Sequence, residues 1–493
     1  MAVNSDNLIS GHGIRYSLND DVYAPEGARW KDLSNHIARP LYDAWVSLFI
    51  KFLPRSFWFA RLSSVATGLI SLVLFFVLGR RLKGEAFGLL LTGLALLHPN
   101  LWIASCVINE QIALCLSGLL LLCIYATQEI RGGWWHFGIG ALSAIPCLVH
   151  QNAIILFSAL FAFHWALHGN RLRWIHLLLL ASGFLAGLIF CLLPVDVGRF
   201  YLFQKSFYWQ LATPPILSGS LNPWTYLSNI GRLFSSPSTF YFSGYEHFRG
   251  GWIASVQWGW AAYAAVTAAG LGTLLIRDPS SGESRLARGL LAGGLISIVA
   301  TGLLIKRQEA LYTLIFLPFF IPLAGLSIYE LWRIPRFRAR LGLASGSVMV
   351  GISMFCFGRF VSAYVRESIP NDEIARRVKI LIGPDTHRIM APNVLWFDFD
   401  RENFRDVSAL VTSRYFTGGE FHPKEWLAPW RPDVLVVDAG VANVLKKYGS
   451  PLEALRNALG IPVKFVGVVE TNGAYGNWGV FRLTWEKEVK SPK

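Results

Sequence analysis

The sequence predicts an α-helical polytopic membrane protein with about 10 transmembrane helices and a small α/β domain at its C-terminal end. Apolar residues occupy 53% of the 493 positions and charged residues only 15%, whereas about a quarter of the residues in soluble domains are charged. The mean hydropathy is +0.42. Nearly uncharged windows of about 20 residues recur as far as residue 361, and each is long enough to cross a hydrocarbon core of about 30 Å.

Ten windows are candidate crossings, and backbone groups inside lipid are satisfied only if the crossings are helices. They cover residues 62–79, 86–104, 111–127, 134–149, 152–168, 173–193, 252–276, 287–305, 310–332 and 341–361. We therefore divide the chain into an outer-face loop with an interfacial helix (1–61), a transmembrane domain (62–361) with an outer loop (195–251), and a soluble α/β domain (362–493). The interfacial helix is expected from Leu41 to Phe52, where apolar residues recur at helical spacing over too short a length to span.

The basic residues fall in every second loop, and this pattern predicts the orientation of the chain. Arginine and lysine occur at 80–85, 129–133, 169–173, 277–288 and 333–340, and the positive-inside rule makes these loops cytoplasmic. The expected location is the plasma (inner) membrane, with the alternate loops and the C-terminal domain outside. A net charge of +14 does not indicate nucleic-acid binding, because the basic residues are not pooled into one patch.

This orientation leads to an expectation about the N-terminus. Residues 1–61 would lie outside, although no charged segment followed by an apolar one is visible as a signal peptide. We therefore expect that the natural protein has one more crossing before Met1.

The cysteines and histidines give no sign of a metal centre. All six cysteines lie in or beside apolar runs, where cysteine behaves as a small hydrophobic residue. The histidines at His12, His36 and His247 have neither helical nor knuckle spacing. We therefore predict no metal site and no cofactor, and keep a divalent metal as the alternative.

The C-terminal residues have the pattern of short strands alternating with helix. Strands are expected at 378–382, 394–399, 434–437, 463–469 and 480–484, and a helix at 441–459 that Gly460 ends. One strand runs into Asp438 and Gly440, as in a Rossmann-like domain, but no glycine-rich phosphate fingerprint accompanies it. Acceptor recognition or a structural cover is the expected role.

Several short motifs occur in a characteristic order. They are Arg39-Pro40-Leu41-Tyr42, Ala60-Arg61-Leu62-Ser63-Ser64, Val77-Leu78-Gly79-Arg80-Arg81-Leu82, Asn109-Glu110, and Glu309-Ala310-Leu311-Tyr312 with Leu317-Pro318. Their order resembles the glycosyltransferase-C superfamily, in the branch of the protein O-mannosyltransferases and the bacterial lipid A aminoarabinose transferase. The resemblance covers about residues 5–130 and 305–332.

The resemblance implies a function. Such enzymes transfer a sugar from a polyprenyl-phosphate donor to a lipid, glycan or protein acceptor on the outer face, with inversion. A carboxylate activates the acceptor hydroxyl, and cations stabilise the leaving phosphate. The candidate phosphate-binding residues are Arg39, Lys306 and Arg307, each of which also fits the description of an interface anchor.

The carboxylates and His150 have competing interpretations. Glu110 is a candidate site residue, but a helix N-terminus also favours a carboxylate. His150 is either a substrate ligand or a structural histidine. The family's acidic pair precedes an Asn-Leu-x-x-Gly segment, which here is Asn7 to Gly11. The resemblance thus places the catalytic base upstream of Met1, with Asp20 and Asp21, in a turn-forming stretch, as the alternative within the chain.

Two other functions compete with the glycosyltransferase. A transporter or lipid flippase is disfavoured because charges are scarce in the middle of the predicted crossings. An O-antigen ligase or polymerase is disfavoured by the soluble C-terminal domain and by the motif that starts at Arg39.

Overall fold

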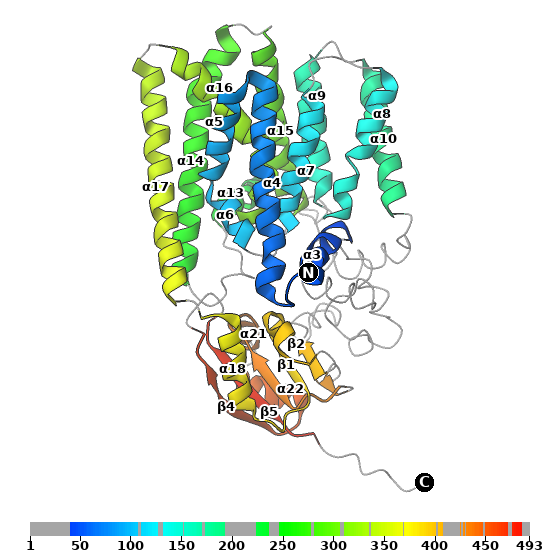
Figure 1. Cartoon of the computed structure of the whole chain (residues 1–493), viewed down its shortest axis with the longest axis vertical. Coiled ribbons are helices and arrows are strands. Elements are labelled where there is room, and N and C mark those ends of the chain that lie inside the picture. The colour runs from blue at the N-terminus through cyan, green and yellow to red at the C-terminus, as the bar shows by residue number, and fades with distance from the viewer. Residues whose placement is uncertain are drawn as a thin grey trace.

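A computed structural model of the chain describes residues 40–106, 110–126, 132–150, 152–169, 173–192, 223–235, 246–277, 281–305, 310–334, 337–367, 369–400, 403–407, 424, 427–428, 430–446, 449–471 and 476–485. Within these ranges, long helices run side by side and a small α/β unit lies at one end of the bundle (Figure 1). We call the end of the bundle beside the α/β unit the near end, and the opposite end the far end.

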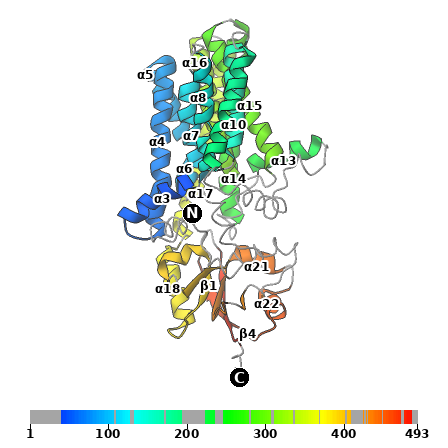
Figure 2. The same ribbon diagram turned by 90° about the vertical axis from the view of Figure 1, so that its right-hand side faces the viewer.

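The bundle begins with the short helix α3 (Pro40–Phe52), in the segment where the sequence predicts one. The helices that follow are α4 (Phe57–Lys83), α5 (Glu85–Leu96), α6 (Pro99–Cys106), α7 (Glu110–Tyr125), α8 (Gly133–Leu142), α9 (Ala153–His168), α10 (Trp174–Leu192), α13 (Pro223–Ser235), α14 (Glu246–Arg277), α15 (Gly282–Leu304), α16 (Leu317–Arg333) and α17 (Phe337–Glu367). The 3-10 turns η1 (Ile145–Leu148) and η5 (Ala310–Ile315) lie between them. The helix α3 lies at the near end, and α13 projects from the side of the bundle (Figure 2).

The predicted helical membrane fold is confirmed, but the predicted count of ten crossings is not. Among the described residues, four helical stretches are long and apolar enough to span, in α4, α10, α15 and α17, and α5 with α6 makes a fifth if the bent pair is one span. The physical reason is that several of the predicted crossings are broken into shorter helices or 3-10 turns. The pair α5 and α6 is bent by 69°, the window 134–149 divides into α8 and η1, and the window 310–332 begins as η5.

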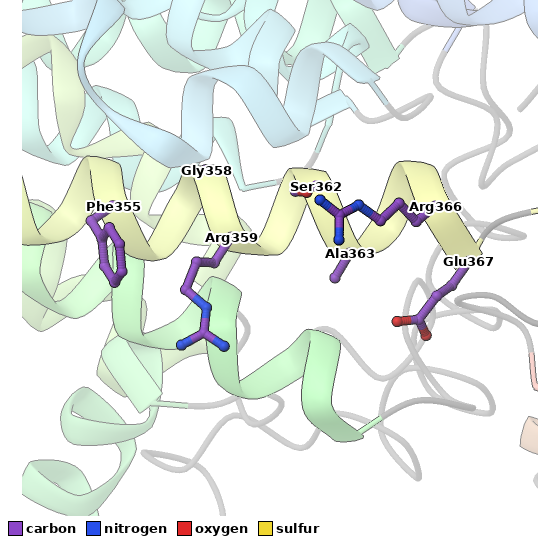
Figure 3. Close-up of a pocket in the computed structure, with 7 residues that line it drawn as sticks. All are labelled: Phe355, Gly358, Arg359, Ser362, Ala363, Arg366 and Glu367. Atoms are coloured by element: carbon purple, nitrogen blue, oxygen red, sulfur yellow. The ribbon is translucent and has the colours of Figure 1, made fainter.

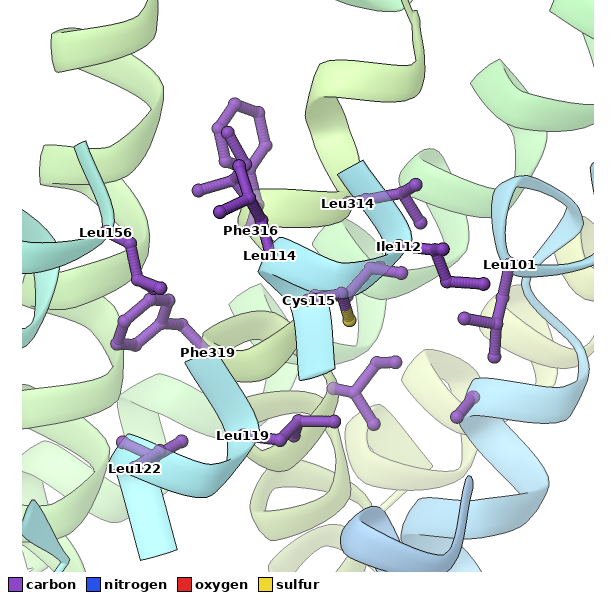
Figure 4. Close-up of a cluster of buried hydrophobic side chains, with 14 of the residues drawn as sticks. Leu101, Ile112, Leu114, Cys115, Leu119, Leu122, Leu156, Leu314, Phe316 and Phe319 are labelled. Atoms are coloured by element: carbon purple, nitrogen blue, oxygen red, sulfur yellow. The ribbon is translucent and has the colours of Figure 1, made fainter. Parts of the chain in front are cut away.

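The helix α7 is the centre of the bundle. Most of its side chains are buried, on every face of the helix, as expected for a helix surrounded by protein. Figure 4 shows its leucines and Cys115 packed against side chains of α6, α9, η5 and α16. Gly118 allows a close approach, because a Cβ there would lie 3.0 Å from Leu156 and 3.0 Å from Pro318. The position of Glu110, the first residue of α7, is therefore fixed by a well-packed helix.

The helices α4 and α5 form a tight hairpin at the far end. A Cβ on Gly79 would lie 2.6 Å from the Cα of Gly88, so only small residues permit this contact between the two backbones. The chain turns at Gly84, whose φ of 92° is unfavourable for residues with a side chain. The sequence motif Val77 to Leu82 thus marks a real helix end.

Charged residues at or beside the ends of three predicted crossings meet at the far end. Lys83 at the end of α4 forms an ion pair with Glu283 of α15 and lies 3.7 Å from Glu330 of α16. Its ammonium group also lies 4.3 Å from the centre of the Tyr329 ring. These contacts bring the ends of three predicted crossings to one side of the bundle.

The C-terminal unit is a three-layer α/β sandwich. It contains β1 (Ile389–Ala391), β2 (Phe404–Asp406), β3 (Val434–Val437), β4 (Val463–Val469) and β5 (Trp478–Leu483), with α18 (Asn371–Ile382), η6 (Asn393–Asp398), α21 (Ala439–Leu445) and α22 (Pro451–Leu459). The sheet order is β2-β1-β3-β5-β4, in which β1 is parallel to β2 and β3, and β5 is antiparallel to β3 and β4. In β3, Val434 and Val436 face α18, while Leu435 and Val437 face α21 and α22, so both faces of the strand are buried.

Two of the predicted strands are wrong. Residues 378–382 end the helix α18, in which Ile374, Val378 and Ile382 recur at helical spacing on the buried face. Residues 394–399 mostly form η6 rather than a strand, after Pro392 ends β1. The real strands β1 and β2 have only three residues each, too few to produce an alternating pattern.

The predicted helix at 441–459 is two helices. The chain breaks after α21, and Ser450 then caps α22 through a capping box with Glu453. The end at Gly460 is confirmed, since Gly460 adopts the left-handed conformation with φ 61°.

Candidate functional site

Polar side chains gather at the near end, where α3 packs against the first turns of α4. The hydroxyl groups of Tyr42 and Ser64 lie 2.8 Å apart in a hydrogen bond. The indole N–H of Trp45 donates to the Ser63 carbonyl at 3.1 Å and to the Thr67 hydroxyl at 3.0 Å. These contacts fix α3 to α4 through the residues of two sequence motifs.

Glu110 and His150 form the centre of this near-end cluster. The Nε2 atom of His150 lies 3.5 Å from Oε1 of Glu110, and both side chains are buried. The Nδ1 atom of His150 accepts a hydrogen bond from the backbone N–H of Asn152 at 3.0 Å. In a neutral ring this leaves the proton on Nε2, facing the carboxylate. The histidine therefore orients Glu110 from the start of α9.

Tyr42 belongs to the same cluster electrostatically. Burial raises the pKa of Tyr42, and the carboxylates of Glu110 and Asp43 raise it further. The phenol therefore stays protonated and is able to donate a hydrogen bond. Asp43, the next residue, is fully buried as well. Two carboxylates, a phenol and an imidazole thus lie within one part of the near end.

A second buried group connects α6 with η5. The side-chain amide of Asn100 donates to the carbonyl of Ala310 at 2.9 Å and to the hydroxyl of Thr313. Its carbonyl oxygen accepts the indole N–H of Trp252 at 3.2 Å. Asn100 thereby anchors the start of η5, the described segment that follows Lys306 and Arg307 in the sequence, beside the helix that leads to Glu110.

An open groove follows the near end of α17 (Figure 3). Its volume is about 530 Å³, and it is lined by Phe355, Gly358, Arg359, Ser362, Ala363, Arg366 and Glu367. Arg359 and Arg366 are two helical turns apart on α17 and bring two guanidinium groups to the near end. Guanidinium groups match phosphate oxygens in geometry and charge, so the groove is suited to an anionic group.

The structure describes only some of the predicted site residues. Glu110 is described, and it lies beside His150. Asp20, Asp21, Arg39, Lys306 and Arg307 lie outside the described residues, so their roles stay predictions. Sequence reasoning missed Asp43, Arg359 and Arg366. Arg359 and Arg366 could have been found, because seven-residue spacing places two arginines on one face of a helix that continues beyond the last predicted crossing.

Exposed tryptophans mark two levels along the bundle. At the far end they are Trp134, Trp165, Trp174 and Trp332, and toward the near end they are Trp58, Trp102 and Trp224. Tryptophan concentrates at membrane–water interfaces. The near-end cluster around Glu110 therefore lies close to one predicted interface.

Metal ligands do not converge in the described part of the chain. No group of three or more His, Cys, Asp or Glu side chains there has the geometry of a metal site as it stands.

A bundle of long apolar helices with an α/β unit at its near end defines the fold of this chain as that of a helical membrane protein. The chain is similar in fold to two solved structures. One is apo ArnT from Cupriavidus metallidurans, with a TM-score of 0.51 and 13% sequence identity over 97% of this chain and 91% of that one. Another is ArnT from the same organism bound to undecaprenyl phosphate, with a TM-score of 0.54 and 16% identity over 97% and 92% of the two chains. No protein-family model matches the sequence, and no curated protein matches it.

Proposed function

We propose that this protein is a membrane glycosyltransferase that transfers a sugar from a polyprenyl-phosphate donor to an acceptor on the outer face of the membrane. The observation that carries the proposal is the fold likeness to ArnT, which extends over 97% of this chain and includes a structure bound to undecaprenyl phosphate. The likeness spans both the bundle and the α/β unit, between which the proposed site lies.

The chemistry of the near end supports this reaction class. Transfer with inversion requires a carboxylate that orients or deprotonates the acceptor hydroxyl, and cations that stabilise the leaving phosphate. Glu110 is a buried carboxylate oriented by His150, and Tyr42 is a protonated phenol close to it. We assign Glu110 to substrate orientation. Asp20 and Asp21 remain the candidates within the chain for the base.

The leaving phosphate needs positive charge at the same end. A lipid monophosphate is balanced by arginine or lysine alone, without a nucleotide-type metal site. Arg39, Lys306 and Arg307 are the sequence-based candidates, and the groove on α17 adds Arg359 and Arg366. The soluble α/β unit touches the bundle beside this region, where the rings of Phe57 and Phe397 lie 5.0 Å apart. We propose that the unit covers the site and contributes to acceptor recognition.

Binding of the lipid phosphate is the first test. Undecaprenyl phosphate should raise the unfolding temperature of the purified full-length chain, and undecaprenol, which lacks the phosphate, should raise it much less. Arg359→Gln should weaken the response, whereas Arg80→Gln at the far end should not. An equal rise in unfolding temperature with both lipids would show that the protein does not recognise the phosphate.

Transfer is the second test. With a sugar-labelled polyprenyl phosphate, an enzyme cleaves the sugar–phosphate bond, while a flippase moves the intact lipid between leaflets. Bond cleavage that Asp20→Asn or Asp21→Asn abolishes would assign the base to that residue. Movement of the intact lipid without cleavage would favour the flippase instead.

A further inference from the structure

Arginines surround the far end of the bundle, away from the proposed transfer site. In the described part of the chain, six of them are exposed, in α4, directly before α10, and in α15, α16 and α17: Arg80, Arg81, Arg173, Arg288, Arg333 and Arg340. We call these six residues the far-end arginines. The helices α10 and α17 lie on opposite sides of the bundle (Figure 1, Figure 2), so the exposed positive charge extends across the whole end.

The charges inside the far end are balanced within the protein. Lys83, whose side chain is only 9% exposed, forms an ion pair with Glu283 and lies 3.7 Å from Glu330. Glu330 also lies 3.7 Å from Arg333. The two glutamates at the ends of α15 and α16 are therefore already held by cations of the protein itself.

The charges on the outside of the far end are not balanced in this way. In the described part of this end, the fully exposed carboxylate is that of Glu85, which lies 3.9 Å from Arg80. Arg81, Arg173 and Arg340 form no ion pair with a described carboxylate. An excess of exposed cations attracts anions from outside the protein.

Neighbouring tryptophans indicate the depth at which these arginines lie. Trp174 directly follows Arg173 and Trp332 directly precedes Arg333, and these two tryptophans are 79% and 81% exposed. Exposed tryptophans concentrate at the level of the lipid headgroups. The far-end arginines therefore lie at the depth of the lipid phosphates.

The sequence uses arginine almost to the exclusion of lysine at this end. The five predicted cytoplasmic loops contain twelve arginines and one lysine, the buried Lys83, whereas the rest of the chain contains twenty arginines and twelve lysines. The positive-inside rule counts both residue types alike, so it explains the charge but not the choice of side chain. A planar guanidinium group binds two phosphate oxygens at once, which an ammonium group does not. The choice of arginine therefore indicates phosphate groups as the partners.

We propose that the far-end arginines bind the phosphates of anionic phospholipids in the membrane leaflet that they face. A single small anion does not reach arginines on opposite sides of the bundle, whereas a layer of headgroups contacts all of them. Basic residues close to a leaflet are attracted by anionic lipids. This surface is separate from the Glu110 cluster at the opposite end of the bundle, so the proposal does not depend on the proposed sugar transfer.

The lipid preference of the purified full-length chain tests the proposal. The chain is reconstituted into nanodiscs of phosphatidylcholine and phosphatidylglycerol that contain no undecaprenyl phosphate, and the lipids that stay bound after release are identified by native mass spectrometry. One basic residue near an anionic surface corresponds to about a fivefold change in binding. We therefore expect phosphatidylglycerol to be enriched about fivefold or more over its share of the nanodisc. The unfolding temperature should also be higher with phosphatidylglycerol than in phosphatidylcholine alone.

Variants of the three arginines that have no carboxylate partner assign the preference to the far end. Arg81→Gln, Arg173→Gln and Arg340→Gln together should remove most of the enrichment. The corresponding three-lysine variant keeps every charge, so it protects the test against a glutamine variant that does not fold or insert, and it should keep only part of the enrichment. The matched control changes three exposed cations outside the far end to glutamine, and it should keep the enrichment: Lys51, Arg55 and Arg232.

Three results would overturn the proposal. The first is a wild-type chain without enrichment, which would leave the far-end arginines to a partner outside the membrane, such as an acidic protein. The second is a three-glutamine variant that keeps the enrichment, or a control variant that loses it equally. The third is a three-lysine variant that keeps all of the enrichment, because the guanidinium groups would then have no part in binding phosphate.

Discussion

The Nε2 atom of His150 lies 3.5 Å from the Oε1 atom of Glu110, in a buried contact between the start of α9 and the start of α7. The two residues are 40 positions apart in the sequence, and the fold brings them together where the bundle faces the α/β unit. A carboxylate fixed in this way is able to orient a substrate hydroxyl without first reorganising.

This contact predicts the effect of removing the charge of Glu110. Glu110→Gln should lower the rate of sugar transfer about 10- to 100-fold, the equivalent of one charge-assisted hydrogen bond. His150→Gln should have a smaller effect, because it removes only the orienting group. Initial rates with a labelled donor measure both. Glu85→Gln, an equal change on an exposed far-end carboxylate, serves as the control, and an equal loss in that variant would contradict the assignment.

The attachment of α3 predicts a change in stability. Tyr42→Phe deletes the hydroxyl that is hydrogen-bonded to Ser64 and should cost about 1 kcal/mol. Trp45→Phe removes a donor with two acceptors and should cost more. Thermal unfolding of the solubilised protein measures the losses. Trp58→Phe, at an exposed position of α4, should be nearly neutral, and a Trp45→Phe variant as stable as Trp58→Phe would count against the attachment.

The ion pairs at the far end predict a contrast between two positions on α4. Lys83 has a side chain only 9% exposed and lies beside Glu283 and the buried Glu330. Lys83→Met leaves Glu330 with the exposed Arg333 as its basic partner and should cost about 1.5–3 kcal/mol. Arg80, 63% exposed and 3.9 Å from Glu85, belongs to a surface pair, so Arg80→Met should cost less than about 1 kcal/mol. Chemical unfolding compares the two variants. Similar losses would show that Lys83 is solvated.

The α/β unit predicts a dependence on pH. Asp438 accepts a hydrogen bond from the backbone N–H of Val441 at 2.8 Å at the start of α21, and burial raises its pKa. A raised folded-state pKa means that stability is greatest below the ordinary aspartate value of about 3.9 and falls as pH rises through the folded-state value. An asparagine side chain still accepts the hydrogen bond from Val441 through its amide oxygen but carries no negative charge. Asp438→Asn should therefore gain stability relative to wild type between acid and neutral pH.

Hydrogen exchange of the segment from β3 to α21 measures this effect in the full chain. The ratio of exchange rates between wild type and Asp438→Asn at each pH cancels the intrinsic pH dependence. A ratio that is constant from pH 4 to pH 7 would contradict the burial of the charge.

Hydrophobic periodicity was sufficient to predict the class of the protein and the short helix α3. It was also sufficient for β3, β4 and β5, because each contains a run of apolar residues. The helix end at Gly460 was predicted from the glycine itself, which is a typical capping residue. Periodicity failed for α18, whose charged residues Glu373 and Arg377 form an ion pair while its apolar residues form only a narrow stripe. It also failed for the breaks inside crossings, although Pro99 at the start of α6 is a local signal for the 69° bend between α5 and α6.

The site was predictable only in part. Glu110 was identified from its place after a crossing, but its pairing with His150 depends on the packing of α7 against α9, which no spacing in the sequence reveals.

Sugar transfer is measured by incubating the purified full-length chain with a polyprenyl phosphate that carries a radiolabelled sugar, and following the sugar as it leaves the lipid. We predict that free polyprenyl phosphate forms in proportion to transferred sugar, and that Glu110→Gln slows its formation while Glu85→Gln does not. Donor lipid that remains intact across a panel of sugars and outer-face acceptors, with a folded protein that binds undecaprenyl phosphate, would show that the protein is not a glycosyltransferase of this kind.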